Sequence, residues 1–259
     1  MIKVLTIAGS DCSGGAGIQA DMKTITAHKM YGMSVITALT AQNTTGVYGV
    51  LDIDPAFVGA QLDAIFTDII PDAVKIGMVS NPRIIEVIAQ KIQAYDIKAI
   101  VLDPVMVATS GGKLLGEEAT SILVEKLLPL ATLITPNIPE AECLCSFSIE
   151  CKEDMVKAAQ TISKSLQGAI LIKGGHFREG ADDLLYVEGK EVWFTGKRIT
   201  TDNTHGTGCT LSSAIACYLA EGLTLAKSVE NAKAYVRGAL EDGLNLGKGN
   251  GPLNHCYRL

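Results

Sequence analysis

The sequence lacks the features that mark disulfide-rich, zinc-binding and membrane-spanning proteins. Its seven cysteines include no Cys-x-x-Cys pair, and its four histidines are too scattered for a metal-binding motif. The apolar run near the N-terminus is too short for a signal peptide, and no stretch approaches the about 20 apolar residues of a membrane span. We therefore expect a soluble, cytoplasmic protein with reduced thiols.

Charge and the common catalytic motifs are scarce as well. Charged residues make up 19% of the chain and the formal net charge is −6, so nothing favours DNA, RNA or an anionic membrane as a partner. There is no Gly-x-Gly-x-x-Gly dinucleotide fingerprint, no P-loop and no nucleophile elbow. These absences argue against a protease, a hydrolase and a zinc enzyme, and make a dinucleotide-dependent oxidoreductase a distant alternative. The expected ligand is small.

Hydrophobic residues, by contrast, are plentiful and regularly arranged. They make up 47% of the 259 residues, beside 26 glycines, which favours one well-buried α/β domain over residues 1–259. Helical patterns alternate with short apolar runs; Asn81 and Pro82, for example, form a typical helix start. This alternation predicts a mostly parallel sheet with helices on both faces. The runs expected to be strands buried on both faces lie at 4–8, 35–40, 73–76, 99–102, 132–134 and 169–172.

Two segments, at 45–53 and 184–194, interrupt the alternation. Both have the pattern of short extended pairs, and the second is expected to turn near Glu188 and Gly189. The chain then ends with two predicted helices, at about 207–221 and 225–244, which Gly222 separates.

The residues that follow the predicted strands are polar, glycine-rich or chemically functional. Because ligands of open α/β sheets bind beyond the carboxyl ends of the strands, we expect these residues to lie on one edge and to share a site. They are 9–11, Gln42 and Asn43, Gly77 and Met78, 103–106, Pro136 and Asn137, and 173–176.

The segment from Asn203 to Cys217 is the most informative in the chain. A glycine-rich turn precedes a helix of small residues, so free N–H groups from Gly206 to Cys209 would converge with the positive end of the helix dipole on a bound anion. In that field Cys209 is expected to favour the thiolate and to act as a base. A structural interpretation also fits, with tightly packed glycines, Thr207 as an N-cap and Cys209 as a small buried side chain.

Three charged residues at the same predicted edge suggest a phosphate and metal site. Asp103 and Glu140 could hold a hydrated Mg²⁺, which usually takes one or two carboxylates, and Lys173 could offset the charge of transferring phosphates. Each also has a structural interpretation. Glu140 forms a capping-box pattern with Asn137, Asp103 could cap a turn, and Lys173 could simply reach water.

In their order along the chain these motifs resemble the ribokinase-like superfamily, and within it the hydroxymethylpyrimidine/phosphomethylpyrimidine kinases of thiamine biosynthesis. The resemblance implies a ribokinase-like α/β fold and a kinase dependent on ATP and Mg²⁺. Such a kinase phosphorylates 4-amino-5-hydroxymethyl-2-methylpyrimidine and then its monophosphate, commonly as a homodimer. The resemblance covers nearly the whole chain, at 8–11, 13–21, 40–44, 75–78, 103–106, 135–140, 173–176, 205–210 and 251–253.

Together the motifs and the resemblance give each residue an expected role. Cys209 and Lys173 are the expected catalytic residues, and Asp103 and Glu140 the expected metal ligands. Sugar kinases of the superfamily carry an aspartate base at the position of Cys209. A thiol has a higher pKa than a carboxyl group, so the helix terminus must lower the pKa of Cys209 for it to act as a base near neutral pH. The nucleotide is expected at Asn137, Lys173, Thr204, Gly206, Thr207 and Gly208, and the substrate ring at Gly9, Asp21, Gln42, Met78 and Val105.

Gln42 distinguishes the pyrimidine kinases from their pyridoxal-kinase relatives. Its amide offers an acceptor beside a donor, which complements the amino group and ring nitrogen of a 4-aminopyrimidine. The pyridoxal kinases of this branch have a similar pattern, but with an apolar residue at the position of Gln42. Met78 and Val105 would contact the flat ring, although both could be core residues. A pyridoxal kinase and a non-catalytic pyrimidine-binding protein are the alternatives.

Overall fold

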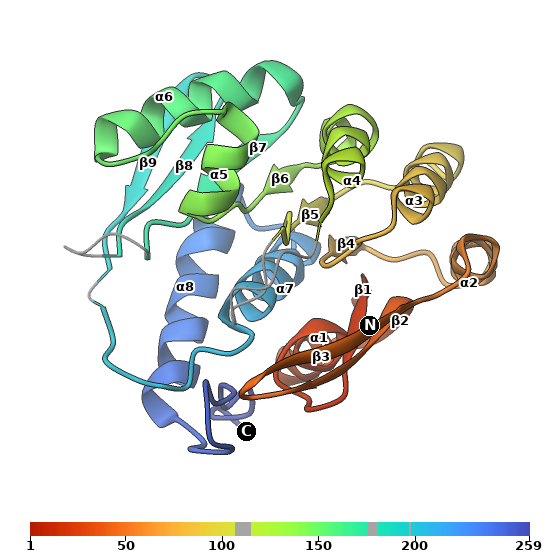
Figure 1. Ribbon diagram of the computed structural model, residues 1–259, viewed down its shortest axis with the longest axis horizontal. Helices are drawn as coiled ribbons and strands as arrows, with labels where there is room; N and C mark the ends of the chain where they lie inside the picture. The colour runs from red at the N-terminus through yellow and green to blue at the C-terminus, as the bar shows by residue number, and fades with distance from the viewer. Residues whose placement is uncertain (107–114, 176–180, 197) are drawn as a thin grey trace.

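The centre of the computed structural model, which describes residues 1–106, 115–175, 181–196 and 198–259, is a nine-stranded sheet (Figure 1). The strands lie in the order β3-β2-β1-β4-β5-β6-β7-β8-β9. Their bounds are β1 (Lys3–Asp11), β2 (Tyr31–Asn43), β3 (Gly46–Asp52), β4 (Ala73–Ile76), β5 (Ile100–Leu102), β6 (Leu133–Ile134), β7 (Ala169–Ile172), β8 (Asp183–Val187) and β9 (Lys190–Phe194).

The direction of the strands confirms the predicted mostly parallel sheet. The inner strands from β2 to β7 all pair in parallel, and β3, β8 and β9 add antiparallel edges. The segment at 184–194 is the expected hairpin, with left-handed backbone at Glu188 and Gly189. The segment at 45–53 is not a pair of its own, because β3 is a single strand that pairs with the end of β2.

Helices cover both faces of the sheet, as the alternation predicts. Helices α2 to α6 lie on one face and α1, α7 and α8 on the other (Figure 1). No helix in the described part of the chain is long and apolar enough to cross a membrane. The helices are α1 (Gly17–Ala27), α2 (Pro55–Phe66), α3 (Pro82–Ala94), α4 (Glu117–Ile122), α5 (Ile138–Cys145), α6 (Lys152–Ile162), α7 (Thr207–Ala220) and α8 (Leu225–Asp242).

Local sequence signals account for several helix ends. The side chain of Asn81 accepts a hydrogen bond of 3.0 Å from the backbone N–H of Arg83, which confirms the predicted start of α3. The last two helices also match their predicted bounds within two residues, and Gly222 between them has the expected positive φ of 84°.

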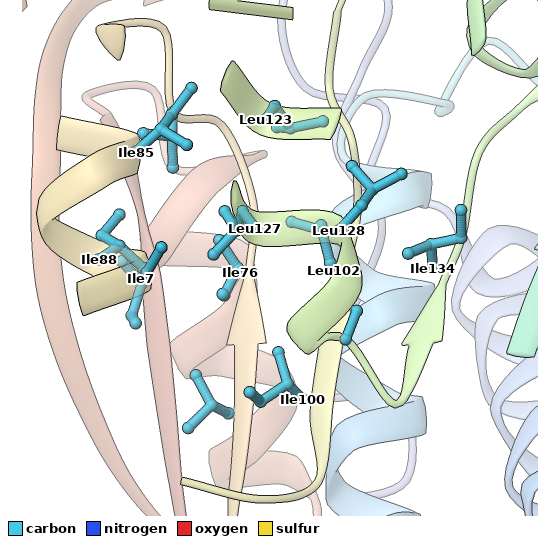
Figure 2. Close-up of a cluster of buried hydrophobic side chains, with 14 of the residues drawn as sticks. Ile7, Ile76, Ile85, Ile88, Ile100, Leu102, Leu123, Leu127, Leu128 and Ile134 are labelled. Carbon is cyan, nitrogen blue, oxygen red and sulfur yellow. The ribbon is translucent and has the colours of Figure 1, made fainter. Parts of the chain in front are cut away.

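The larger of two buried clusters lies between the sheet and helices α2 to α6. In Figure 2, Ile7 and Ile76 of the sheet lie on the side of Ile88 of α3, and Leu102 lies beside Leu127 and Leu128. Strands β4 to β7 are buried along their whole length, as predicted. Strand β2 instead alternates between buried and exposed positions, because it lies beside the exposed edge strand β3 and runs on beyond the core.

Strands β1 and β2 are longer than predicted at their carboxyl ends. Their pairing continues past a bulge between Ala8 and Ser10 and includes Asp11 opposite Thr40. Consequently 9–11 and Gln42 with Asn43 lie inside the strands instead of following them. The two long strand ends project toward the same edge of the sheet.

A buried ion pair and the hydrogen bonds to it join four elements beneath that edge. Lys75 of β4 donates to both carboxylate oxygens of Asp21 of α1, at 2.9 and 2.8 Å, and both side chains are fully buried. Asp21 also accepts from Thr6 of β1 and from Ser213 of α7. Burial alone would lower the pKa of Lys75, but the charge of Asp21 outweighs it and raises that pKa. The pair therefore fixes α1 and α7 against the sheet.

Lys75→Met tests this assignment. The change leaves the carboxylate of Asp21 buried without its counter-charge, so we expect the free energy of unfolding to fall by about 3–5 kcal/mol in urea titrations. The matched control is Lys227→Met, which breaks the exposed pair with Glu230 at 2.7 Å and is expected to change stability by less than about 1 kcal/mol. Equal losses in the two variants would contradict a structural role for the buried pair.

Candidate active site

A cavity of about 1090 Å³ opens at the carboxyl ends of the strands. Strand β1 has β2 as its neighbour on one side and β4 on the other, so the order of the strands along the sheet reverses at β1. The cavity lies at this reversal, where ligands of open α/β sheets usually bind. The residues predicted to share one edge do meet here. The lining includes Gly9, Gln42, Asn43, Met78, Asp103, Val105, Asn137 and Lys173, whereas His176 lies outside the described residues.

The first turn of α7 presents backbone to this cavity. Its N-cap is Gly206, which has a φ of 83° and contributes no side-chain cap. A Cβ atom at Gly206 would lie 1.8 Å from the carbonyl oxygen of Gly15, so only glycine fits. The N–H groups of Gly208 and Cys209 have no acceptor within the helix and lie at the positive end of its dipole. This geometry suits an anion.

Thr207 is not the N-cap that the sequence suggested. It is the first residue of α7, and its hydroxyl donates back to the carbonyl oxygen of Thr204 at 2.7 Å. Both threonines line the cavity beside Gly206 and Gly208. The glycine, not a side chain, therefore ends the turn and leaves the helix terminus open.

Asp103 and Lys173 meet directly in front of that terminus. The ammonium group of Lys173 donates to Asp103 Oδ1 at 2.8 Å, and Thr135 donates to the same oxygen at 2.9 Å. A Cβ atom at Gly208 would lie 3.4 Å from Asp103 Oδ2 and 3.5 Å from Lys173 Nζ. Lys173 therefore does not simply reach water. It is paired at the anion corner, where Asp103 and Glu140 raise its pKa against the opposing effect of burial.

Glu140 forms the predicted capping box and also lies at the cavity. The capping box with Asn137 is present, with bonds of 2.8 and 2.9 Å, and the side chain is also buried at the lining of the cavity. Burial raises the pKa of Glu140 to about 7, and the nearby charge of Asp103 adds to the rise while Lys173 opposes it. A second cation beside Asp103 and Glu140 would relieve this excess of negative charge.

These two carboxylates fit a largely hydrated Mg²⁺ and do not form a complete metal cage. Among the described residues, no group of three or more His, Cys, Asp or Glu side chains is arranged to hold a metal ion. Magnesium commonly keeps several waters and takes only one or two carboxylates. The donor set therefore agrees with the metal expected from the sequence.

Cys209 lies at the floor of the cavity but does not have the expected thiolate character. Burial raises the pKa of its thiol to about 11, and the carboxylates of Asp21 and Asp103 add to the rise while Lys75 opposes it. The helix terminus is therefore not sufficient to ionise Cys209 in the free protein. The thiol is neutral near pH 7.

At the other end of the cavity lie the residues predicted to hold the substrate ring. Gly9 and Met78 are in close contact, since a Cβ atom at Gly9 would lie 2.7 Å from Met78 Cε. Gln42 and Val105 also line the cavity. Asp21 does not, because its carboxylate is fully buried and saturated by Lys75, Thr6 and Ser213. Asp21 is therefore not among the described residues that line the cavity.

Sequence reasoning missed Asp11 and His205. The carboxylate of Asp11 accepts hydrogen bonds from the turn at 13–16 and lies 2.8 Å from His205 Nε2. Burial alone would raise the pKa of Asp11, but these bonds, led by that from His205, lower it to about 2. Asp11 and His205 belong to two of the motifs named above. However, the sequence gives no sign that residues 194 positions apart are partners.

A further wing of the cavity was also missed. It extends between the end of the β8–β9 hairpin and helix α8, where Lys233 donates to the backbone oxygen of Phe194 at 3.3 Å and pairs with Asp183. The hairpin was predicted but not placed opposite α8, because only the order of strands in the sheet brings them together. Trp193, Gly196, Ala234, Val236, Arg237 and Leu240 line this wing.

Comparison with known proteins places the chain among kinases. The family model for phosphomethylpyrimidine kinase matches residues 11–254. The chain is 48% identical to the hydroxymethylpyrimidine/phosphomethylpyrimidine kinase of Rhizobium meliloti, over 98% of this chain and 97% of that protein. It is 49% identical to the thiamine biosynthesis bifunctional protein ThiED of Geobacter sulfurreducens, over 97% of this chain but only 52% of that longer protein.

Solved structures share the fold. The phosphomethylpyrimidine kinase of Clostridium difficile has a TM-score of 0.83 at 46% identity, over 92% of this chain and 98% of that one. The pyridoxal kinase of Staphylococcus aureus in complex with AMP-PCP and pyridoxal has a TM-score of 0.92 at 34% identity, over 99% and 94%. The fold is common to both kinds of kinase, and the sequence is more similar to the pyrimidine kinase.

Gly206→Ala tests the anion corner. The new methyl group would collide with the Gly15 carbonyl and displace the first turn of α7, so we expect affinity for ADP to fall by at least about a hundredfold in calorimetric titrations. Gly222→Ala is the matched control, since its φ is 84° but no atom lies within 4 Å of the added methyl. Both variants carry similar backbone strain, and only the first should lose the nucleotide. Equal affinities would contradict the assigned corner.

Proposed function

Because the chain belongs to the phosphomethylpyrimidine kinase family, we propose that it transfers the γ-phosphoryl group of ATP to 4-amino-5-hydroxymethyl-2-methylpyrimidine and then to the monophosphate, in thiamine biosynthesis. One observation carries the proposal. A single cavity joins the open terminus of α7, with Asp103 and Lys173 against it, to the amide of Gln42. A phosphate corner and a ring-recognition corner thus lie within one site.

At the phosphate corner, the N–H groups of Gly208 and Cys209 bind the transferring phosphoryl group. Lys173 stabilises its charge, and Thr204, Thr207 and Asn137 line the corner around the nucleotide phosphates. Asp103 and Glu140 are the residues that would hold Mg²⁺, which supplies positive charge to the nucleotide phosphates. The wing between the β8–β9 hairpin and α8 accepts the remainder of the nucleotide.

At the other corner, the flat ring packs against Gly9, Met78 and Val105, and the amide of Gln42 pairs with its amino group and ring nitrogen. The hydroxymethyl oxygen attacks the γ-phosphorus, the bond from that phosphorus to the β-phosphate oxygen breaks, and ADP leaves. Cys209 accepts the hydroxyl proton. Because the resting thiol is neutral, this role requires ligand binding to lower the pKa of Cys209.

A homodimer is part of the proposal. Apolar side chains of β2, β3 and α2 are exposed, whereas edge strands usually carry few exposed apolar side chains. A second copy of the chain would cover them. They are Leu39, Tyr48, Val50, Leu51 and Phe57.

Cys209→Ala separates the two transfers. The first acceptor is an alcohol that must lose a proton, whereas the second is already an anionic phosphate. We therefore expect kcat/KM for the alcohol to fall by about 10²–10⁴ and that for the monophosphate by less than about tenfold, measured by ADP release. Cys217→Ala removes a buried thiol further along α7 and should leave both values nearly unchanged. Equal losses for both acceptors would count against Cys209 as the base.

A turnover screen tests the function as a whole. The protein is incubated with ATP and the pyrimidine alcohol, its monophosphate, pyridoxal or ribose, and ADP release is recorded. We expect turnover of the first two and none of the sugar, and Gln42→Met should shift preference toward pyridoxal because an apolar side chain cannot pair with the aminopyrimidine edge. ADP release with pyridoxal alone would support a pyridoxal kinase, and binding without ADP release would support a non-catalytic pyrimidine-binding protein.

A further inference from the structure

A hydrogen-bonded chain of side chains leads from the glycine-rich turn of β1 to the amide of Gln42. His205 Nε2 lies 2.8 Å from Asp11 Oδ2 and 3.2 Å from Gln42 Nε2. The carboxamide oxygen, Gln42 Oε1, lies 3.3 Å from Thr40 Oγ1. Asp11, Thr40 and His205 are buried, and Gln42 is half-buried at the cavity.

The contact with Asp11 fixes the proton of His205. Hydrogen bonds hold the pKa of Asp11 at about 2, so its carboxylate is ionised at neutral pH and can only accept. His205 Nε2 must therefore carry a hydrogen. The nitrogen of the Gln42 amide faces it at 3.2 Å, so two donors oppose each other, and reversing the amide removes this conflict. The amide oxygen is the atom that suits this position.

Thr40 independently favours the same orientation, because its hydroxyl lies closer to the Ser10 oxygen, at 3.0 Å, than to the Gln42 carboxamide, at 3.3 Å. Its hydroxyl has one hydrogen and lies 3.0 Å from the backbone oxygen of Ser10, which can only accept. Once the hydroxyl donates to Ser10, Thr40 Oγ1 is free to accept from the Gln42 amide. The amide nitrogen is therefore the atom on the Thr40 side. Two neighbours from different elements select one of the two amide orientations.

We infer that His205 is a positioning residue for substrate recognition, which holds the Gln42 amide with its oxygen toward α7 and its nitrogen toward Thr40. This inference rests on the proposed function. His205 then occupies one lone pair of the amide oxygen, and Thr40 occupies one N–H of the amide nitrogen. The second lone pair and the second N–H remain to face the ring. Their order, acceptor on the α7 side and donor on the Thr40 side, is then fixed.

That order determines which way round the ring binds. The 4-amino group donates to the amide oxygen, and the adjacent ring nitrogen accepts from the amide N–H. In the substrate, the hydroxymethyl group is on the carbon next to that bearing the amino group, on the side away from the ring nitrogen. The fixed amide thus places the hydroxymethyl group toward α7, whose first turn begins two residues after His205. A reversed amide would point it away from the phosphate corner.

His205→Phe tests the inference, because it keeps a ring of similar shape but removes the N–H. We expect KM for the pyrimidine alcohol, and its Kd in calorimetric titrations, to rise by about tenfold to a hundredfold, with the KM for ATP changing by less than about threefold. Preference for the alcohol over its analogue without the 4-amino group should fall by a similar factor. His205→Gln retains N–H groups for Asp11 and for the Gln42 oxygen and should recover most of both effects.

A double-mutant cycle with Gln42→Met distinguishes positioning from general support of the fold. If His205 acts through Gln42, His205→Phe should raise the KM for the alcohol by less than about threefold in the Gln42→Met background. Any damage that His205→Phe does to the turn at 13–16 is present in both backgrounds and cancels. An equal rise in both backgrounds, or an unchanged preference for the 4-amino group in the single variant, would overturn the inference.

The unmodified protein separates this inference from the proposed function. If it neither binds nor phosphorylates the pyrimidine alcohol, the proposed function fails and the positioning role fails with it. If it does phosphorylate the alcohol but the two substitutions are additive, the function stands and only the role of His205 is rejected.

Discussion

The site depends on how closely the first turn of α7 approaches the carboxyl edge of the sheet. A side chain is excluded at Gly206, where a Cβ would strike the Gly15 carbonyl, and a Cβ at Gly208 would already be in van der Waals contact with Asp103 and Lys173. Backbone N–H groups therefore face the cavity where side chains would otherwise fill it. The approach is maintained from behind, because Ser213 of the same helix donates to the buried carboxylate of Asp21.

This approach also concentrates charge. Two ion pairs, Asp21 with Lys75 and Asp103 with Lys173, lie under and beside the helix terminus, and Glu140 adds a carboxylate without a cation of its own. Burial raises the pKa of Glu140, and the negative charge of Asp103 adds to the rise while Lys173 opposes it. An incoming polyphosphate would increase the negative charge at this corner, so its binding is favourable only together with the helix terminus, Lys173 and an added cation. We expect a corner of this kind to favour a metal-bound polyphosphate over a free one.

The sequence predicted most of the strands, the parallel sheet and the edge at which the polar motifs meet, because periodicity and strand-end chemistry are local properties. The kinase family followed from motif order. Tertiary partners were not predictable in the same way. Asp21 was expected at the substrate ring, but the sequence does not show that Lys75 saturates it, and the pairing of Asp11 with His205 joins opposite ends of the chain. The expectation of a thiolate at Cys209 was wrong for the same reason. The helix terminus can be recognised in the sequence, but the burial that raises the pKa of the thiol cannot.

The neutral thiol of Cys209 is consistent with a base that is needed only late in the reaction. Phosphoryl transfer passes through a loose transition state, in which bond formation to the attacking oxygen lags behind departure of the leaving group. The alcohol becomes acidic only as that bond forms, so an ionised base is of little use before it. A resting thiolate beside Asp21 and Asp103 would also repel the nucleotide phosphates. A thiol that ionises only when a bound cation brings positive charge to the corner avoids this conflict, whereas an aspartate in that position would carry its charge throughout.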